Sequence, residues 1–203
     1  MTHPAIQYRE RIQPTLDAWA PKGEKQVEGH MVLSDLSLRT VNVIADLVKP
    51  RKMIEIGFNA GHSALAWMET LPNLTVHSID ICRHGYTQPC AKEIEKVYGK
   101  RFKFGNIDSH QINPRSFAEY DFAFIDGGHE REDVQNDWMI CANSEIEWIL
   151  IDDYDLNKEI RSLVQHIIAS EDHNYVFAGI FRYESMAIDE VGTTDCVLLR
   201  RTT

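Results

Sequence analysis

Residues 53–63 read Met-Ile-Glu-Ile-Gly-Phe-Asn-Ala-Gly-His-Ser and join a short apolar segment to a glycine turn. Ile54 and Ile56 are β-branched and favour a buried strand. Gly57 and Gly61 permit a tight turn and a close approach of the backbone to a ligand. Apolar residues then recur at three- and four-residue steps, which predicts a helix from about Gly61. A glycine turn that leads into a helix N-terminus favours an anionic or carboxylate-bearing ligand.

Predicted strands and helices alternate along most of the chain. The pattern predicts strands at 53–56, 74–79, 101–104, 121–125, 148–151, 175–183 and 195–200. Helices are expected from Ser34 or Asp35 to Pro50, from Gly61, at 89–98, around 134–141 and at 160–168. Only a polar turn separates the last two strands, so they should form an antiparallel hairpin. This alternation indicates an α/β fold, doubly wound around a mostly parallel, seven-stranded sheet. We expect a helical and loop extension at 1–33 and a single domain at 34–203.

The composition argues against a nucleic-acid or membrane protein and favours a cytoplasmic one. The 203 residues carry a net charge of −10. A protein whose main partner is nucleic acid or an anionic membrane usually presents a basic face. No apolar run approaches the roughly 20 residues that span a bilayer, and the N-terminus lacks an apolar signal core. The four cysteines show no metal-binding spacing, so we expect free thiols.

Polar residues end the predicted strands. These residues are Gly57, Asp80, Asp108, Asp126 and Asp152. Ligands of open α/β sheets bind outside the carboxyl ends of the strands. We therefore expect these residues to line one crevice, although an aspartate at such a position can also simply cap a helix.

The glycine spacing decides between cofactor classes. A nicotinamide dinucleotide fold requires G-x-G-x-x-G, but the second and third glycine positions here are Asn59 and His62. Instead, Glu55-x-Gly57-x-x-x-Gly61 followed by Asp80 resembles the S-adenosylmethionine site of class I methyltransferases, over roughly residues 32–200. The resemblance implies that the glycine turn holds the methionine part, Asp80 the ribose and residues 107–109 the adenine. It also implies that Ser63, at the start of the helix, could bind the ligand carboxylate. The cofactor-binding residues expected from it are Glu55, Gly57, Asn59, Gly61, Ser63, Asp80, Ile107, Asp108, Ser109 and Asp126.

A second group of residues follows the fourth and fifth predicted strands. Asp126 and the pair Asp152-Asp153 bring three carboxylates together, and these cannot all stay ionised without a partner. Oxygen ligands of this kind suit Mg²⁺; helix caps and a surface salt bridge are the alternative. The pattern resembles the metal-dependent small-molecule O-methyltransferases of the sugar- and antibiotic-tailoring or catechol type. That resemblance implies Asp126, Asp152 and Asp153 as metal ligands. It also implies His129, three residues after Asp126, as the catalytic base.

The expected function is therefore methyl transfer from S-adenosylmethionine to a hydroxyl oxygen of a small molecule, assisted by a divalent metal. His129 and Asp126 are the expected catalytic residues. A metal-independent class I methyltransferase and a non-catalytic cofactor-binding protein remain alternatives. We expect a small-molecule acceptor as partner, with no nucleic acid and no membrane. The acceptor, the pathway and the oligomeric state, including a homo-oligomer, are left open by the sequence.

Overall fold

The computed structural model describes residues 4–19, 30–170, 174–187 and 190–202. Within these ranges the strands are β1 (His30–Met31), β2 (Lys52–Ile56), β3 (Thr75–Asp80), β4 (Phe102–Asn106), β5 (Phe122–Ile125), β6 (Trp148–Ile151), β7 (Tyr175–Ala187) and β8 (Glu190–Arg201). The α-helices are α1 (Pro4–Trp19), α2 (Asp35–Val48), α3 (His62–Thr70), α4 (Thr87–Tyr98), α5 (Arg131–Asn143) and α6 (Lys158–Ala169). Two short 3-10 helices are η1 (Gly99–Arg101) and η2 (Ser109–Gln111).

The strands of the described ranges form one sheet in the order β1-β7-β8-β6-β5-β2-β3-β4. β6, β5, β2, β3 and β4 run parallel, whereas β8 pairs antiparallel with both β6 and β7. The predicted doubly wound α/β class with its terminal antiparallel hairpin is thereby confirmed. The structure adds the two-residue strand β1, which was not predicted and which pairs with β7. So short a segment shows no periodicity from which a strand could be predicted.

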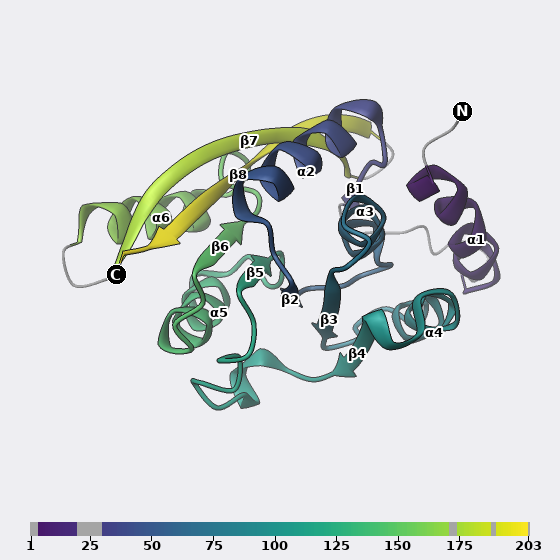
Figure 1. The fold of residues 1–203 in the computed structure, drawn as a ribbon, viewed down its shortest axis with the longest axis horizontal. Helices are drawn as coiled ribbons and strands as arrows, with labels where there is room; N and C mark the ends of the chain where they lie inside the picture. Colours follow the sequence, from purple (N-terminus) through teal and green to yellow (C-terminus); the bar gives the residue numbers. More distant parts are fainter. Residues whose placement is uncertain (1–3, 20–29, 171–173, 188–189, 203) are drawn as a thin grey trace.

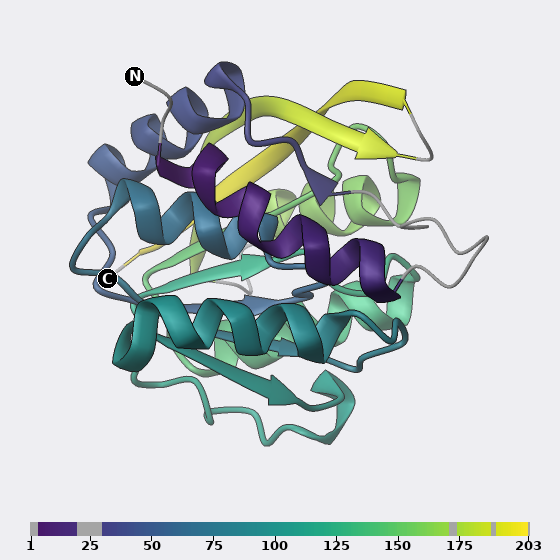
Figure 2. The ribbon, with the colours of Figure 1, turned by 90° about the vertical axis from the view of Figure 1, so that its right-hand side faces the viewer.

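Helices cover both faces of the sheet, as Figure 1 shows. Because successive residues of a strand point to opposite faces, Ile54 and Ile56 join one buried cluster and Met53 joins the other. α5 and α6 pack over the first cluster, and α2, α3 and α4 pack over the second. α1 lies along α3 and α4 as an outer helix of the second side (Figure 2). Among the described residues, no helix combines the length and apolarity that crossing a bilayer requires.

Local sequence signals place the ends of several elements. Ser34 caps α2, since its hydroxyl accepts the backbone N–H of Ser37 at 3.3 Å, and α2 ends before Pro50. The β7–β8 hairpin continues as far as the pair Ala187 and Glu190, well beyond the predicted strand ends. Backbone hydrogen bonds sustain this pairing without an apolar pattern. The predicted boundary between an extension at 1–33 and a domain at 34–203 stays a prediction, and residues 20–29 lie outside the described ranges.

Candidate cofactor and metal site

The turn between β2 and α3 needs glycine for two physical reasons. Gly57 and Gly61 have φ angles of +95° and +84°, which residues other than glycine rarely adopt. A Cβ atom on Gly57 would lie 1.8 Å from the carbonyl oxygen of Asp126. The turn after β2 is therefore in direct backbone contact with the residue that follows β5. This contact brings the predicted cofactor turn and the predicted metal site next to each other.

Asp80, at the end of β3, lies against this turn. One of its carboxylate oxygens, Oδ2, accepts the backbone N–H groups of Phe58 and Asn59, both at 2.9 Å. The other oxygen accepts the N–H of Cys82 at 2.6 Å. Asn59 itself has a positive φ of +51°, a conformation that asparagine adopts more readily than most residues. Asp80 thus fixes the turn and stays partly exposed at its edge, where a ribose hydroxyl could reach it.

Glu55 is completely buried beneath the turn. Its carboxylate accepts hydrogen bonds from the hydroxyls of Ser63, at 2.5 Å, and of Ser78. Burial raises the pKa of Glu55 to about 7, and the two hydroxyl donors only partly oppose that effect. The Ser63 hydroxyl is therefore engaged with Glu55 in this structure, whereas the resemblance implied that it could bind the ligand carboxylate.

The loop after β4 carries the residues expected at the adenine. Ile107 is exposed, and Asp108 accepts the backbone N–H of His110 at 3.0 Å as the cap of η2. Ser109 accepts a hydrogen bond from Asn136 of α5 at 3.2 Å. It also hydrogen-bonds Asp137, a buried carboxyl whose pKa burial raises to about 6. Asp137 was not predicted from the sequence. Its place between the core residues Val134 and Trp138 of a predicted helix could have indicated a buried acid.

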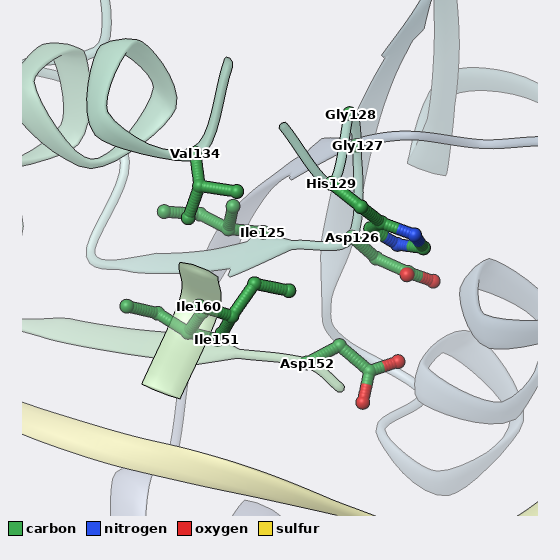
Figure 3. A pocket seen from close by; sticks show the side chains of 9 residues that line it. All are labelled: Ile125, Asp126, Gly127, Gly128, His129, Val134, Ile151, Asp152 and Ile160. Atoms are coloured by element: carbon green, nitrogen blue, oxygen red, sulfur yellow. The ribbon is translucent and has the colours of Figure 1, made fainter. Parts of the chain in front are cut away.

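The acids after β5 and β6 converge because these strands are paired neighbours, with Ile125 opposite Ile151. Asp126 and Asp152 lie at one end of the pocket in Figure 3, and apolar side chains form its other end. Burial and the neighbouring carboxylates Asp152 and Asp153 raise the pKa of Asp126 well above its usual range. Burial, followed by the charge of Asp153, raises the pKa of Asp152 to about 8. Such a group is stabilised by protons or by a cation.

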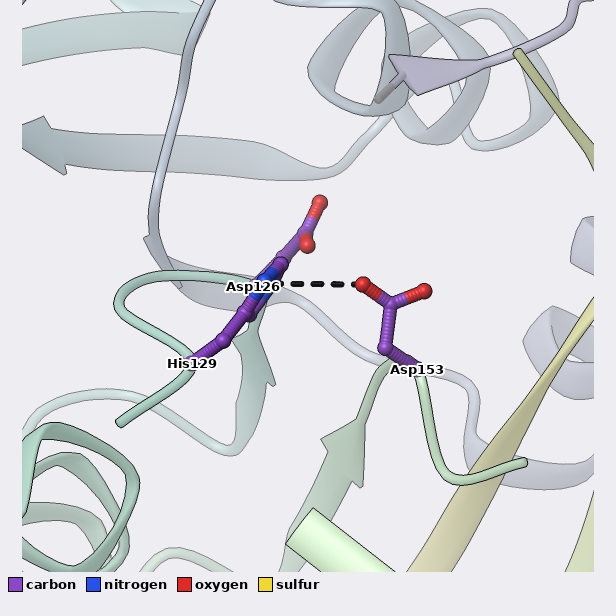
Figure 4. Close-up of side chains that lie close together, drawn as sticks. All are labelled: Asp126, His129 and Asp153. Carbon is purple, nitrogen blue, oxygen red and sulfur yellow. Dashed lines mark ion pairs between the residues drawn. The ribbon is translucent and has the colours of Figure 1, made fainter. Parts of the chain in front are cut away.

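His129 reaches the same place from the loop that leads into α5. Its Nε2 lies 3.2 Å from Oδ2 of Asp153 (Figure 4). Asp126, His129 and Asp153 each offer a ligand atom within 4.8 Å of the others. Asp152 is directed differently, because its carboxylate accepts the hydroxyl of the buried Tyr183 and the backbone N–H of Asp153. Carboxylate oxygens and an imidazole nitrogen are a donor set that suits a divalent cation such as Mn²⁺.

The fold is the Rossmann-like fold of methyltransferases. The glycine turn after β2 and the acid that ends β3 lie at the carboxyl ends of the parallel strands, where α/β proteins bind ligands. Residues 54–154 match a family model described as a methyltransferase domain. The segment that carries the glycine turn and the acids after β5 and β6 therefore matches a methyltransferase domain, and the chain has the Rossmann-like methyltransferase fold.

Solved structures share the fold at low sequence identity. An O-methyltransferase from Bacillus cereus in complex with SAH is 14% identical, with a TM-score of 0.66, and the match covers 99% of this chain and 92% of that chain. A SAH-bound methyltransferase from Podospora anserina is also 14% identical, with a TM-score of 0.66 over 100% and 89%. The branched-chain polyamine synthase of Thermus thermophilus is 11% identical, with a TM-score of 0.68 over 94% and 63%. Since the last protein is a polyamine synthase by name, the shared fold does not by itself fix the reaction. No curated protein sequence matches the chain.

Proposed function

We propose that this protein transfers a methyl group from S-adenosylmethionine to a hydroxyl oxygen of a small molecule with the help of a divalent cation. The observation that carries the proposal is the backbone contact between Gly57 and Asp126. It sets a cofactor turn beside a group of acids, as a reaction between a bound methyl donor and an acceptor held at those acids requires. The net charge of −10 supports a small-molecule acceptor over nucleic acid.

The proposed donor site uses the turn after β2 and the loops beside it. Its residues are Glu55, Gly57, Asn59, Gly61, Ser63, Asp80, Ile107, Asp108, Ser109 and Asp126. The SAH complexes of the Bacillus cereus and Podospora anserina proteins, which share this fold, support this part of the proposal. Asp80 has the geometry to bind a ribose hydroxyl, because its partly exposed carboxylate lies at the edge of the turn.

The proposed metal ligands are Asp126, Asp152 and Asp153, with Mg²⁺ as the expected ion. Each oxygen of Asp152 accepts one hydrogen bond and keeps a second lone pair for an ion. The donor set fits, because burial and mutual repulsion make the carboxyls costly to ionise without a cation. When bound, the ion acts as a Lewis acid, which lowers the pKa of an acceptor hydroxyl. The three acids would hold the ion beside the turn after β2, where its charge would help to orient an acceptor hydroxyl toward the methyl group.

His129 is the proposed base. Its imidazole is about half exposed, and Nε2 lies on the side of Asp126 and Asp153. The carboxylate of Asp153 lies 3.2 Å from Nε2 and holds the ring beside the acids. Histidine exchanges protons near neutral pH, which suits a group that must accept one proton in each cycle.

The experiment compares wild type with Asp152→Ala and His129→Gln. Calorimetry should show that wild type binds S-adenosylhomocysteine and does not bind NAD. A panel of vicinal diols and catechols with Mn²⁺ or Mg²⁺ should give turnover that EDTA abolishes. Asp152→Ala should lose the metal-dependent turnover and keep cofactor binding. His129→Gln should bind both the cofactor and the metal but turn over slowly.

Other outcomes identify the alternatives. Turnover that survives both EDTA and Asp152→Ala would show a metal-independent methyltransferase. Cofactor binding without turnover on any acceptor of the panel would favour a non-catalytic cofactor-binding protein. Binding of NAD in place of S-adenosylhomocysteine would overturn the assignment of the donor site.

A further inference from the structure

The terminal hairpin reaches the acids after β6 with two hydroxyl groups. Tyr183 of β7 and Thr194 of β8 are directly opposite one another in the antiparallel register. Both side chains therefore lie on the same face of the sheet. Tyr183 is 3% exposed and Thr194 is completely buried. Buried hydroxyls need partners, and each of these two has found one of the two consecutive aspartates.

The hydroxyl of Tyr183 donates to Oδ2 of Asp152. The other oxygen of Asp152 accepts the backbone N–H of Asp153 at 2.8 Å. Asp152 is itself only 4% exposed. Its carboxylate is thus held at both oxygens, so the phenol of Tyr183 fixes its rotation beside Asp126.

The hydroxyl of Thr194 lies 2.9 Å from Oδ1 of Asp153 and 3.3 Å from Oδ1 of Asp155, and it donates to the nearer of the two oxygens, that of Asp153. This bond leaves Oδ2 of Asp153 on the side of His129, 3.2 Å from its Nε2. The backbone of Asp153 has a φ of +53°, which costs free energy unless the surroundings hold it. β8 holds the adjoining loop: Asp195 accepts the N–H of Tyr154 at 2.8 Å and donates its own N–H to Asp155 at 2.7 Å.

We infer that Tyr183 and Thr194 are positioning residues of the metal site, one hydroxyl for each of the two acids after β6. The inference rests on the proposed function. According to this inference, the β7–β8 hairpin both completes the sheet and forms part of the metal site. Hydrogen-bond partners of metal ligands typically change metal affinity by about 10- to 100-fold when they are removed. The cofactor turn makes no contact with either hydroxyl among the described hydrogen bonds, so cofactor affinity should not depend on them.

The test is a titration of Mn²⁺ into the full chain saturated with S-adenosylhomocysteine, followed by calorimetry. Tyr183→Phe and Thr194→Val should each weaken Mn²⁺ binding by about 10-fold or more. Thr194→Ser keeps the hydroxyl and should restore wild-type affinity. Tyr175→Phe is the matched control, because Tyr175 is another buried tyrosine of β7 whose hydroxyl donates to the carbonyl of Ile146 at 2.6 Å, away from the acids. All variants should bind S-adenosylhomocysteine like wild type.

The controls separate this inference from the proposed function. If wild type binds Mn²⁺ and both Tyr183→Phe and Thr194→Val bind it equally well, the positioning role is wrong while the metal site stands. If wild type binds S-adenosylhomocysteine but no Mn²⁺, the metal site and the positioning role fall together and the donor site stands. If Tyr183→Phe does not fold, the pair Thr194→Val and Thr194→Ser decides, since valine keeps the shape of threonine without the hydroxyl and serine keeps the hydroxyl without the methyl group.

Discussion

The carboxylate of Asp80 accepts the backbone N–H of Phe58 at 2.9 Å, which ties the end of β3 to the turn after β2. The same oxygen accepts the N–H of Asn59, and the other oxygen accepts that of Cys82. A residue expected to bind the cofactor therefore also shapes the turn that surrounds it. Substitutions here must be read for stability and for binding at once.

Asp80→Ala should lower both cofactor affinity and stability. Hydrogen bonds to a charged acceptor contribute about 1.5–3 kcal/mol each. Because Asp80 is partly exposed, water can replace part of its three bonds, so we expect a total loss of about 3 kcal/mol and a fall in Tm of about 6–12 °C. Affinity for S-adenosylhomocysteine should fall by about 10-fold or more, since that corresponds to about 1.4 kcal/mol. Thermal unfolding and calorimetry measure the two effects separately.

Asp121→Ala is the control for that change. Asp121 accepts the backbone N–H groups of Arg51 and Lys52, at 3.0 and 2.9 Å, before the start of β5 and so at the opposite end of the sheet from Asp80. It should lose stability by the same mechanism and keep cofactor affinity. Equal loss of affinity in both variants would mean that Asp80 acts on the cofactor only through general stability.

Gly57→Ala should prevent folding or cost more than about 4 kcal/mol. The added Cβ would lie 1.8 Å from the Asp126 carbonyl oxygen, and backbone atoms cannot move aside cheaply. Gly99→Ala shares the positive φ, +55°, but its Cβ would meet no atom within 4 Å. Its ψ of −123° lies outside the left-handed helical region, so backbone strain alone should cost about 1–3 kcal/mol. Circular dichroism during heating compares the two, and similar melting curves would show that the contact with Asp126 is not tight.

Glu55 should make stability decrease as the pH rises toward 7. Its pKa in the folded chain, about 7, exceeds the ordinary value of 4.5, so the folded state binds the extra proton between these values. The stabilisation is complete below about pH 4.5 and is lost as the pH passes 7. At about 1.4 kcal/mol for each pH unit, the change amounts to about 3 kcal/mol.

Glu55→Gln removes this titration and keeps the shape of the side chain. The stability of the variant relative to wild type should therefore increase as the pH rises from 5 to about 8. The measurement is the difference in Tm between the two proteins across that range. A difference that does not change with pH would show that Glu55 has no raised pKa.

Removal of the metal should lower the Tm of wild type and leave the Tm of Asp126→Asn unchanged. A ligand at 100 times its Kd stabilises the folded state by about 2.7 kcal/mol, so Mn²⁺ should raise the Tm and EDTA should reverse the rise. Asp126→Asn replaces a carboxylate of the group around His129 and Asp153 and should show no shift. A variant that responds to Mn²⁺ like wild type would place the ion elsewhere.

The order of strands and helices was readable from the sequence because it depends on local physical properties. The β-branched residues of 53–56, the glycines after them and the helical stripes each act over a few neighbours along the chain. The terminal hairpin followed from the absence of a helix between two apolar segments. The strand-end rule then predicted which polar residues meet, and the structure brings Asp126, Asp152 and Asp153 together at the ends of β5 and β6.

The tertiary structure alone decided how those residues are held. Tyr183 and Thr194 reach Asp152 and Asp153 across 31 and 41 residues of sequence, through strand pairing that no local pattern encodes. The engagement of Ser63 with Glu55 likewise depends on how α3 packs over β2. Hydrogen bonds between distant segments form only where the register of a sheet and the packing of a helix set the two groups within reach. The sequence therefore determined the kind of site, and the folded chain determined which hydroxyl holds which carboxylate.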